Sequence, residues 1–213
     1  MRGTDELLLR QAIVFGSAFV YWAGVAIQAR RIRRHIGRSP NVKPRGTKER
    51  LLWLGWMAVT LAWIGQPVLV GGNTSTVFLR LQCSLPHGPS LLAGAVLVLA
   101  GYVGTLWCYA AMGDTWRMGI NRKEKNPLIR HGPYRHVRHP IYVFQVVMLA
   151  GTACLLPTVL SLVVWVVHLV CVWVKALDEE AYLLVVHGEP YREYVNQTGR
   201  LLPKVIHRTG PTA

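Results

Sequence analysis

The chain has 213 residues, of which 52% are hydrophobic, and a mean hydropathy of +0.28. This composition is too apolar for an ordinary soluble domain and indicates an integral membrane protein. The net charge of +14 lies beside apolar segments, where anionic lipid headgroups explain it more simply than nucleic acid does. We therefore expect a lipid bilayer, and no nucleic acid, among the partners.

Four apolar stretches follow one another along the chain. They are residues 11–28, 51–72, 90–112 and 141–174. Each is close to or above the ~20 residues that a helix needs to cross the ~30 Å hydrocarbon core of a bilayer. Pro157 is expected to break the last stretch, because proline removes a backbone donor and clashes with the preceding turn. The sequence therefore predicts an all-α integral membrane protein with five transmembrane helices, the last two forming a hairpin of residues 141–156 and 158–174.

The basic residues predict how these helices are oriented. Most of the 24 lysines and arginines lie in residues 29–50, 113–140 and 175–213, whereas residues 73–89 carry Arg80 alone. By the positive-inside rule, the N-terminus is outside and the C-terminus is cytoplasmic. The short loops favour a prokaryotic inner membrane.

The third apolar stretch has a face of small residues, formed by Gly94, Gly101 and Gly104. Close packing against another helix is the first interpretation of such a face. A cofactor lying against this smooth surface is the alternative.

Residues 113–140 are rich in polar and aromatic side chains and contain turns at Pro127 and Pro133. Pro140 is placed where a helix begins, because proline is favoured in the first turn, and His139 directly precedes it. This segment should therefore enter the fourth apolar stretch in a fixed direction.

The chain after the hairpin is predicted to stay helical. Residues 178–187 continue as an amphipathic helix that Gly188 ends. Tyr191 and Tyr194 belong to a further short helix opened by Pro190. These C-terminal helices are expected on the cytoplasmic side.

Opposite charges are expected to meet at the membrane surface, with Arg135, Arg138 and His139 on one wall and Glu179 and Glu180 on the other. Arginine can grip a carboxylate with two hydrogen bonds, and a carboxylate can hold an ammonium group, so such a site suits a zwitterion. Carboxylates at the edge of a membrane are functional candidates by default. The alternative is that they only form ion pairs within the protein.

Aromatic rings could add to this site, because Tyr134, Tyr142 and Trp116 offer faces suited to a cation. The three histidines between residues 131 and 139 lack the spacing of known zinc sites, so we expect no metal. His168 stands alone in an apolar helix and is predicted to be a hydrogen-bonded packing residue.

Two motifs with an acidic pair behind them resemble a known family. They are Leu128-Ile129-Arg130-His131-Gly132-Pro133-Tyr134 and Arg138-His139-Pro140-Ile141-Tyr142, followed by Glu179-Glu180, Gly188, Tyr191, Tyr194 and Arg200-Leu201-Leu202-Pro203. In order and spacing they resemble the isoprenylcysteine carboxyl methyltransferase family, which shares its cofactor-binding half with phospholipid methyltransferases. The resemblance covers roughly residues 112–204. It implies an N-terminal three-helix membrane region, 1–112, and a cofactor-binding region, 113–213.

The resemblance implies that S-adenosyl-L-methionine binds here and leaves as S-adenosyl-L-homocysteine. The residues implied to line it are Asn126, Pro127, Leu128, Ile129, Tyr134, His139, Pro140, Ile141, Tyr142 and Glu179. Glu179 would accept hydrogen bonds from the amino group. Lys175 stands where protein-methylating members have an arginine that contacts the substrate, and Phe144 stands where many members have glycine.

The methyl acceptor would be lipophilic: an isoprenylcysteine-type carboxylate, a lipid amine or a small thiol. Glu180 and Arg138 are the candidate catalytic residues, because an amine must lose a proton and Glu180 or a nearby histidine could take it. Two other functions stay open from the sequence. They are an NADPH-dependent membrane reductase of the sterol-reductase type and a non-enzymatic protein that binds anionic lipid.

Overall fold

The computed structural model describes residues 2–37, 39, 40, 44, 46–70, 87–118 and 126–204. The helices are α1 (Arg2–Ile36), α2 (Thr47–Leu69), α3 (His87–Met112), α4 (Pro140–Leu155), α5 (Val159–His187) and α6 (Glu189–Gln197), with short 3-10 turns η2 (Gly113–Thr115) and η3 (Gly132–Arg135). A parallel bridge pairs Val137 with Gly199. Most of the predicted 73–89 loop, with Arg80, lies outside the described residues.

Proline or glycine lies at the ends of α1, α4 and α5. α1 runs through its arginines to Ile36, and Gly37 follows with a φ of 70°. Between α4 and α5, Pro157 is followed by Thr158, whose side chain caps α5 by accepting a hydrogen bond from the Ser161 N–H at 3.0 Å. Gly188 ends α5 with a φ of 58°, which side-chain-bearing residues rarely adopt.

The all-helical membrane class is confirmed. Four helical segments are long and apolar enough to cross a bilayer: Thr4–Ile36, Thr47–Leu69, Gly88–Thr115 and Val159–His187. α4 has 16 residues, which cover about 24 Å at ~1.5 Å per residue, so a fifth crossing stays a prediction. The hairpin helix predicted up to residue 174 and the amphipathic helix predicted for residues 178–187 form one continuous helix, α5, which ends at His187 beside Gly188.

The glycine face of α3 packs against α4, as predicted. A Cβ atom added at Gly101 would lie 2.6 Å from the Phe144 carbonyl oxygen, and one added at Gly104 would overlap the Phe144 ring. A Cβ atom added at Gly94 would lie against the Gly151 backbone and the Leu155 side chain of α4. The small residues therefore let two helix backbones approach closely.

A buried arginine ties the helices together at the end of the bundle that holds the α4–α5 turn. Arg10 pairs with Glu6 at 2.8 Å and donates to the backbone carbonyls of Cys154 at 3.4 Å and Leu155 at 3.1 Å. The last carbonyls of a helix have no partner within it and carry partial negative charge, so a guanidinium there is stabilising. Arg10 thus fixes α1 to the end of α4.

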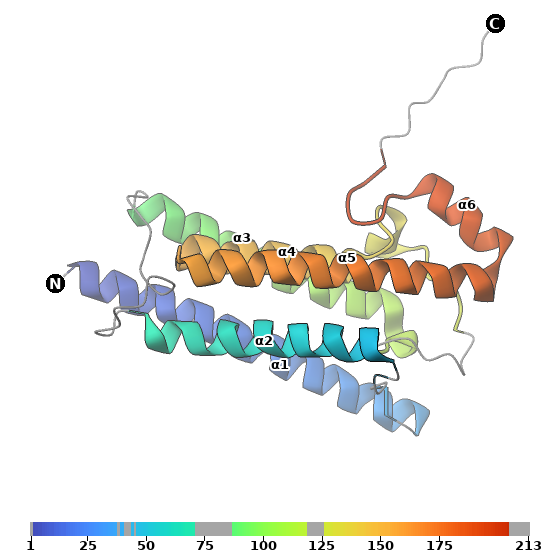
Figure 1. Ribbon diagram of the computed structural model, residues 1–213, viewed down its shortest axis with the longest axis horizontal. Coiled ribbons are helices and arrows are strands. Elements are labelled where there is room, and N and C mark those ends of the chain that lie inside the picture. The colour runs from blue at the N-terminus through green and yellow to red at the C-terminus, as the bar shows by residue number, and fades with distance from the viewer. Residues whose placement is uncertain are drawn as a thin grey trace, which may run out of the picture.

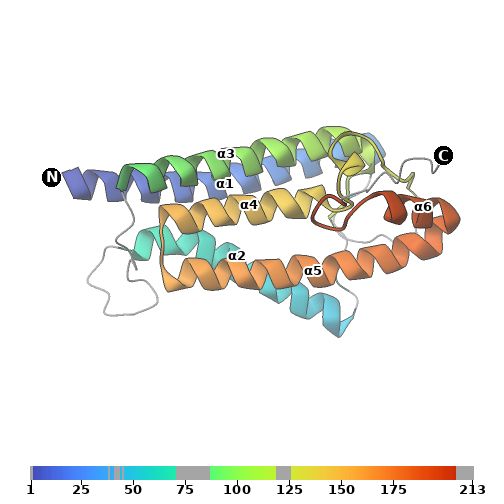
Figure 2. The same cartoon turned by 90° about the horizontal axis from the view of Figure 1, so that it is seen from above.

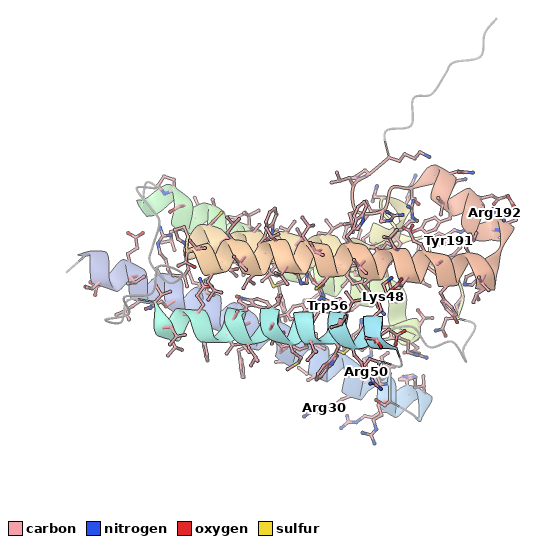
Figure 3. All side chains as sticks on the ribbon, viewed as in Figure 1. Arg30, Lys48, Arg50, Trp56, Tyr191 and Arg192 are labelled. Atoms are coloured by element: carbon pink, nitrogen blue, oxygen red, sulfur yellow. The ribbon has the colours of Figure 1, made fainter. Side chains whose placement is uncertain are left out.

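The opposite end of the bundle gathers the polar segments. Figure 1 shows that α1 ends, α2 begins and α5 ends there, with α6 folded back beside the chain that leads into α4. Figure 2, seen from above, places α4 between α3 and α5, with α6 near the start of α4. Arg30, Lys48, Arg50 and Arg192 all lie at this end (Figure 3), where the sequence places the cytoplasm.

Candidate functional site

A cavity of about 730 Å³ lies at this end of the bundle and extends between the helices. Sites for small molecules typically have about 300–1,000 Å³. Its lining includes most of the predicted site residues: Asn126, Pro127, Leu128, Ile129, Tyr134, Arg138, His139, Ile141, Tyr142, Lys175 and Glu179. The two others, Pro140 and Glu180, are not among the described residues that line it. Segments far apart in the sequence thus converge on one space.

Glu179 of α5 is held at the wall of this cavity by two residues from the start of α4. The Tyr142 hydroxyl donates a hydrogen bond to Glu179 Oε1 at 2.8 Å, and His139 Nδ1 lies 3.4 Å from Glu179 Oε2. The His139 and Tyr142 rings are stacked, with centroids 5.5 Å apart and planes 8° apart. A carboxylate fixed in this way faces the cavity and can hold a cation.

Glu180, the next residue, points to a different set of partners. Arg138 Nε donates to it at 2.9 Å, and Arg200 donates through Nε at 3.0 Å and Nη2 at 2.7 Å. The Glu180 side chain is 13% exposed and that of Arg138 is 8% exposed. The Glu180 carboxylate thus joins three parts of the chain, which are α5, the segment before α4 and the segment after α6.

The backbone reinforces the same junction. The Arg138 N–H donates to the Gly199 carbonyl at 2.9 Å, and the His139 N–H donates to the Arg200 carbonyl at 3.1 Å. The Arg200 guanidinium also lies 4.8 Å from the centroid of the Trp173 ring. His139 therefore enters α4 in an orientation that the C-terminal segment determines.

The pKa of His139 reflects its position between two carboxylates. Burial by itself lowers this pKa, but the hydrogen bond and charge of Glu179 and the charge of Glu180 outweigh burial, so the pKa stands above 6.5. His139 Nε2 lies 3.3 Å from Glu180 Oε1, although it is not aligned for a hydrogen bond. The imidazolium form thus balances part of the negative charge of the acidic pair.

The polar loop before α4 is held down by α6. The Tyr194 hydroxyl donates to the Tyr134 carbonyl at 2.6 Å, and Arg130 donates to the Pro190 carbonyl while lying 5.7 Å from the Tyr194 ring centroid. Tyr134 is 9% exposed. Burial raises the pKa of Tyr194 to about 12, so its hydroxyl stays a donor at neutral pH.

Several lining residues were not singled out as site residues by the sequence. Gln145 of α4 donates to the Tyr21 hydroxyl of α1 at 2.5 Å, and both line the cavity, as do Trp63 of α2 and His168 of α5. Gln145 is a polar residue in an apolar helix, a recognisable sign of an interior position. For Trp63 no such sign exists, because tryptophan also suits a lipid-facing position.

Three sequence predictions can be compared with these positions. Trp116 lines the cavity and packs edge-on against Tyr109, with ring centroids 5.4 Å apart. Arg135 is exposed and is not among the described lining residues. The prediction that His168 is hydrogen-bonded is wrong for the part of the chain that the structure describes, where neither ring nitrogen has a partner.

Phe144, which stands where the resemblance implies a glycine, does not line the cavity among the described residues. Its ring lies against Gly104 of α3 instead. The large side chain therefore lies at the interface between α3 and α4. Lys175, the other departure, does line the cavity and is 8% exposed.

Comparison with known families gives one finding that bears on this geometry. Residues 89–189 match the family described as phospholipid methyltransferase. The match spans α3, α4 and α5 and includes His139, Tyr142 and the acidic pair. A comparison with curated proteins gave no match.

Proposed function

Through residues 89–189 this chain belongs to the phospholipid methyltransferase family, whose members are membrane methyltransferases with lipid-type substrates. From this premise we propose that the cavity binds S-adenosyl-L-methionine at its polar end and a lipophilic methyl acceptor in its apolar part. The observation that carries it is the meeting of residues 126–129, His139, Tyr142 and Glu179 around one cavity.

The residues present suit this cofactor. Glu179 offers a carboxylate for the ammonium group, and Tyr134 and Tyr142 line the same space with aromatic surface that attracts a sulfonium cation. The Tyr191 hydroxyl lies at the cavity wall, is buried, and has no hydrogen-bond partner among the described residues. It can pair with a polar atom of the ligand, since buried polar groups are generally hydrogen-bonded.

When bound, the cofactor supplies an electrophilic methyl group on a positively charged sulfur. The acceptor's lone pair forms the new bond as the carbon–sulfur bond breaks, and the bonding electrons pass to sulfur. An amine or thiol acceptor would also have to release a proton to a base or to water, whereas a carboxylate acceptor would not. The chain contributes position and exclusion of water, and alignment alone can supply several kcal/mol of the barrier. His139 and Tyr142 hold Glu179 in place for this purpose.

We assign Glu180 a positioning role in place of the catalytic role expected from the sequence. A general base needs a free lone pair within reach of the substrate, whereas both Glu180 oxygens accept hydrogen bonds from arginines. Arg138, in turn, orients the segment that leads into α4. Pro140 acts in the same way, by starting that helix in its first turn.

Lys175 is proposed to contact an anionic group of the acceptor, a carboxylate or a phosphate. It lies one turn before Glu179 on α5, inside the cavity. A lysine provides a single point charge, which suits either anion without the two-point geometry that an arginine imposes. The acceptor therefore need not be an isoprenylcysteine-type carboxylate.

We also propose that α4 and α5 cross the membrane as a hairpin, which gives five crossings with the C-terminus in the cytoplasm. This orientation places the cofactor end of the cavity at the cytosol. It is supported by the basic side chains gathered at that end of the bundle (Figure 3).

Calorimetric titration of the purified protein in detergent tests the cofactor assignment. We expect S-adenosyl-L-methionine to bind, and Glu179→Gln to weaken binding at least tenfold, about 1.4 kcal/mol. The control is Glu189→Gln, because Glu189 lies on α6 with its side chain 68% exposed. Binding of NADPH in place of S-adenosyl-L-methionine would instead support a reductase, and binding of neither would remove both proposals.

A further inference from the structure

The cavity has a second polar region, deeper in the bundle than the site described above. His168 of α5 and Trp63 of α2 both line the cavity and are 5% and 6% exposed. Among the residues that the structure describes, neither His168 ring nitrogen has a hydrogen-bond partner, and neither does Trp63 Nε1. A buried polar group without a partner is unfavourable, so its presence at a cavity calls for an explanation.

Two contacts between α2 and α5 lie on either side of these groups along the helices. Gln66 Nε2 donates to Ser161 Oγ at 2.5 Å, and at the other end Gly55 lies against the Cys171 sulfur. Trp63 and His168 fall between these contacts on the two antiparallel helices. At ~1.5 Å per residue they are separated by about 6 Å along the bundle, which their long side chains can bridge.

This region is distinct from the cofactor end. His168 precedes Lys175 by two helical turns on α5, a distance of about 10 Å along the helix, and precedes Glu179 by about 16 Å. The intervening cavity wall includes apolar side chains such as Leu149 of α4. A ligand that reaches from Lys175 to His168 would therefore be extended and largely apolar.

We propose that His168 and Trp63 form a subsite for a hydrogen-bonding oxygen of a lipophilic ligand, a hydroxyl or an ester carbonyl. The indole N–H can only donate, and imidazole can donate from one nitrogen, so together they suit an oxygen that accepts. The inference rests on the proposed function in one respect: if the ligand is the methyl acceptor, that acceptor is a lipid with an oxygen about 10 Å from the group that Lys175 contacts. Binding of an oxygen by His168 and Trp63 does not itself require the cofactor.

Fluorescence quenching without cofactor tests the subsite. The probes are 16-bromo-1-hexadecanol and 1-bromohexadecane, which differ by the terminal hydroxyl, and their bromine quenches tryptophans such as Trp53 and Trp56 that line the cavity. His168→Phe and Trp63→Phe should each weaken binding of the alcohol about fivefold and leave the bromoalkane within about twofold. His168→Gln should retain most of the affinity for the alcohol, because its amide can replace the imidazole donor.

His187→Phe is the control, because His187 lies on the same helix and cavity but at the cytoplasmic end, and it should not alter discrimination between the probes. Equal alcohol affinity in the wild type, His168→Phe and Trp63→Phe would overturn the subsite. So would a parallel loss of both probes, which would indicate a change in cavity shape. Since no cofactor is added, failure here leaves the calorimetric test of cofactor binding unaffected.

Discussion

Removing the carboxylate of Glu180 should destabilise the protein strongly, because it would leave Arg138 buried without its negative partner. Both arginines that bind Glu180 do so at 3.0 Å or less, and the Arg138 side chain is 8% exposed. Breaking such a buried pair from one side costs about 3–5 kcal/mol. Arg138 still donates to the carbonyls of Val195 and Thr198, so we expect Glu180→Ala to fall near the lower limit, about 3 kcal/mol.

Thermal unfolding in detergent, followed by tryptophan fluorescence, measures this loss. For a chain of this size, 1 kcal/mol corresponds to about 2–4 °C, so Tm should fall by about 6–12 °C. Glu189→Gln removes the exposed pair with Arg192 and should shift Tm by less than about 2 °C, since such pairs contribute about 0–1 kcal/mol. If Glu180→Ala unfolds at the same temperature as this control, the proposed stabilising role of the Glu180 pairs with Arg138 and Arg200 is refuted.

Two further changes probe the acidic pair and the helix packing. The pKa of His139 is raised in the folded state, so its stabilising charge is fully present below about pH 6.5 and is lost as the pH rises through the folded pKa. Tm should therefore fall over this pH range in the wild type and fall less in His139→Gln. Parallel pH profiles of Tm in the two proteins would contradict this. Gly104→Ala should lower stability by about 1–3 kcal/mol, because the added carbon overlaps Phe144. Gly65→Ala, where nothing lies within 4 Å, is its control and should not lower Tm.

The sequence predicted helix ends well where the backbone itself carries the information. Pro157 interrupts hydrogen bonding and Gly188 has a positive φ, and helices end at or beside both. The apolar run stops at Val174, whereas α5 continues to His187. Apolar content marks the membrane boundary, and helical structure can cross that boundary.

The polar half of the site was also predictable in part. The motif before α4 and the pair Glu179-Glu180 were expected to meet, and His139 and Tyr142 do contact Glu179. Arg138 was expected to face this pair and does bind Glu180, whereas Arg200 was not predicted to do so. Arg200 reaches Glu180 only because the chain after α6 folds back, a matter of tertiary structure.

The apolar part of the cavity could not be predicted from the sequence. The central part of α1 and most of α2 are apolar on nearly every face, so the periodicity of their side chains does not distinguish a cavity wall from a lipid-facing surface. Tyr21 and Trp63 are identified only by the neighbours that α4 and α5 bring to them. His168 and Gln145 were the available signs, since a polar residue in an apolar helix generally faces the interior.

The central claim is tested most directly by following a labelled methyl group. Purified protein reconstituted in liposomes made from a bacterial lipid extract would be incubated with S-adenosyl-L-methionine labelled in its methyl group, and the lipid fraction analysed by mass spectrometry. We predict a labelled lipid species with the wild type and with Glu189→Gln, and at least tenfold less with Glu179→Gln. A protein that binds the cofactor and yet transfers no label to any extracted lipid would contradict the account.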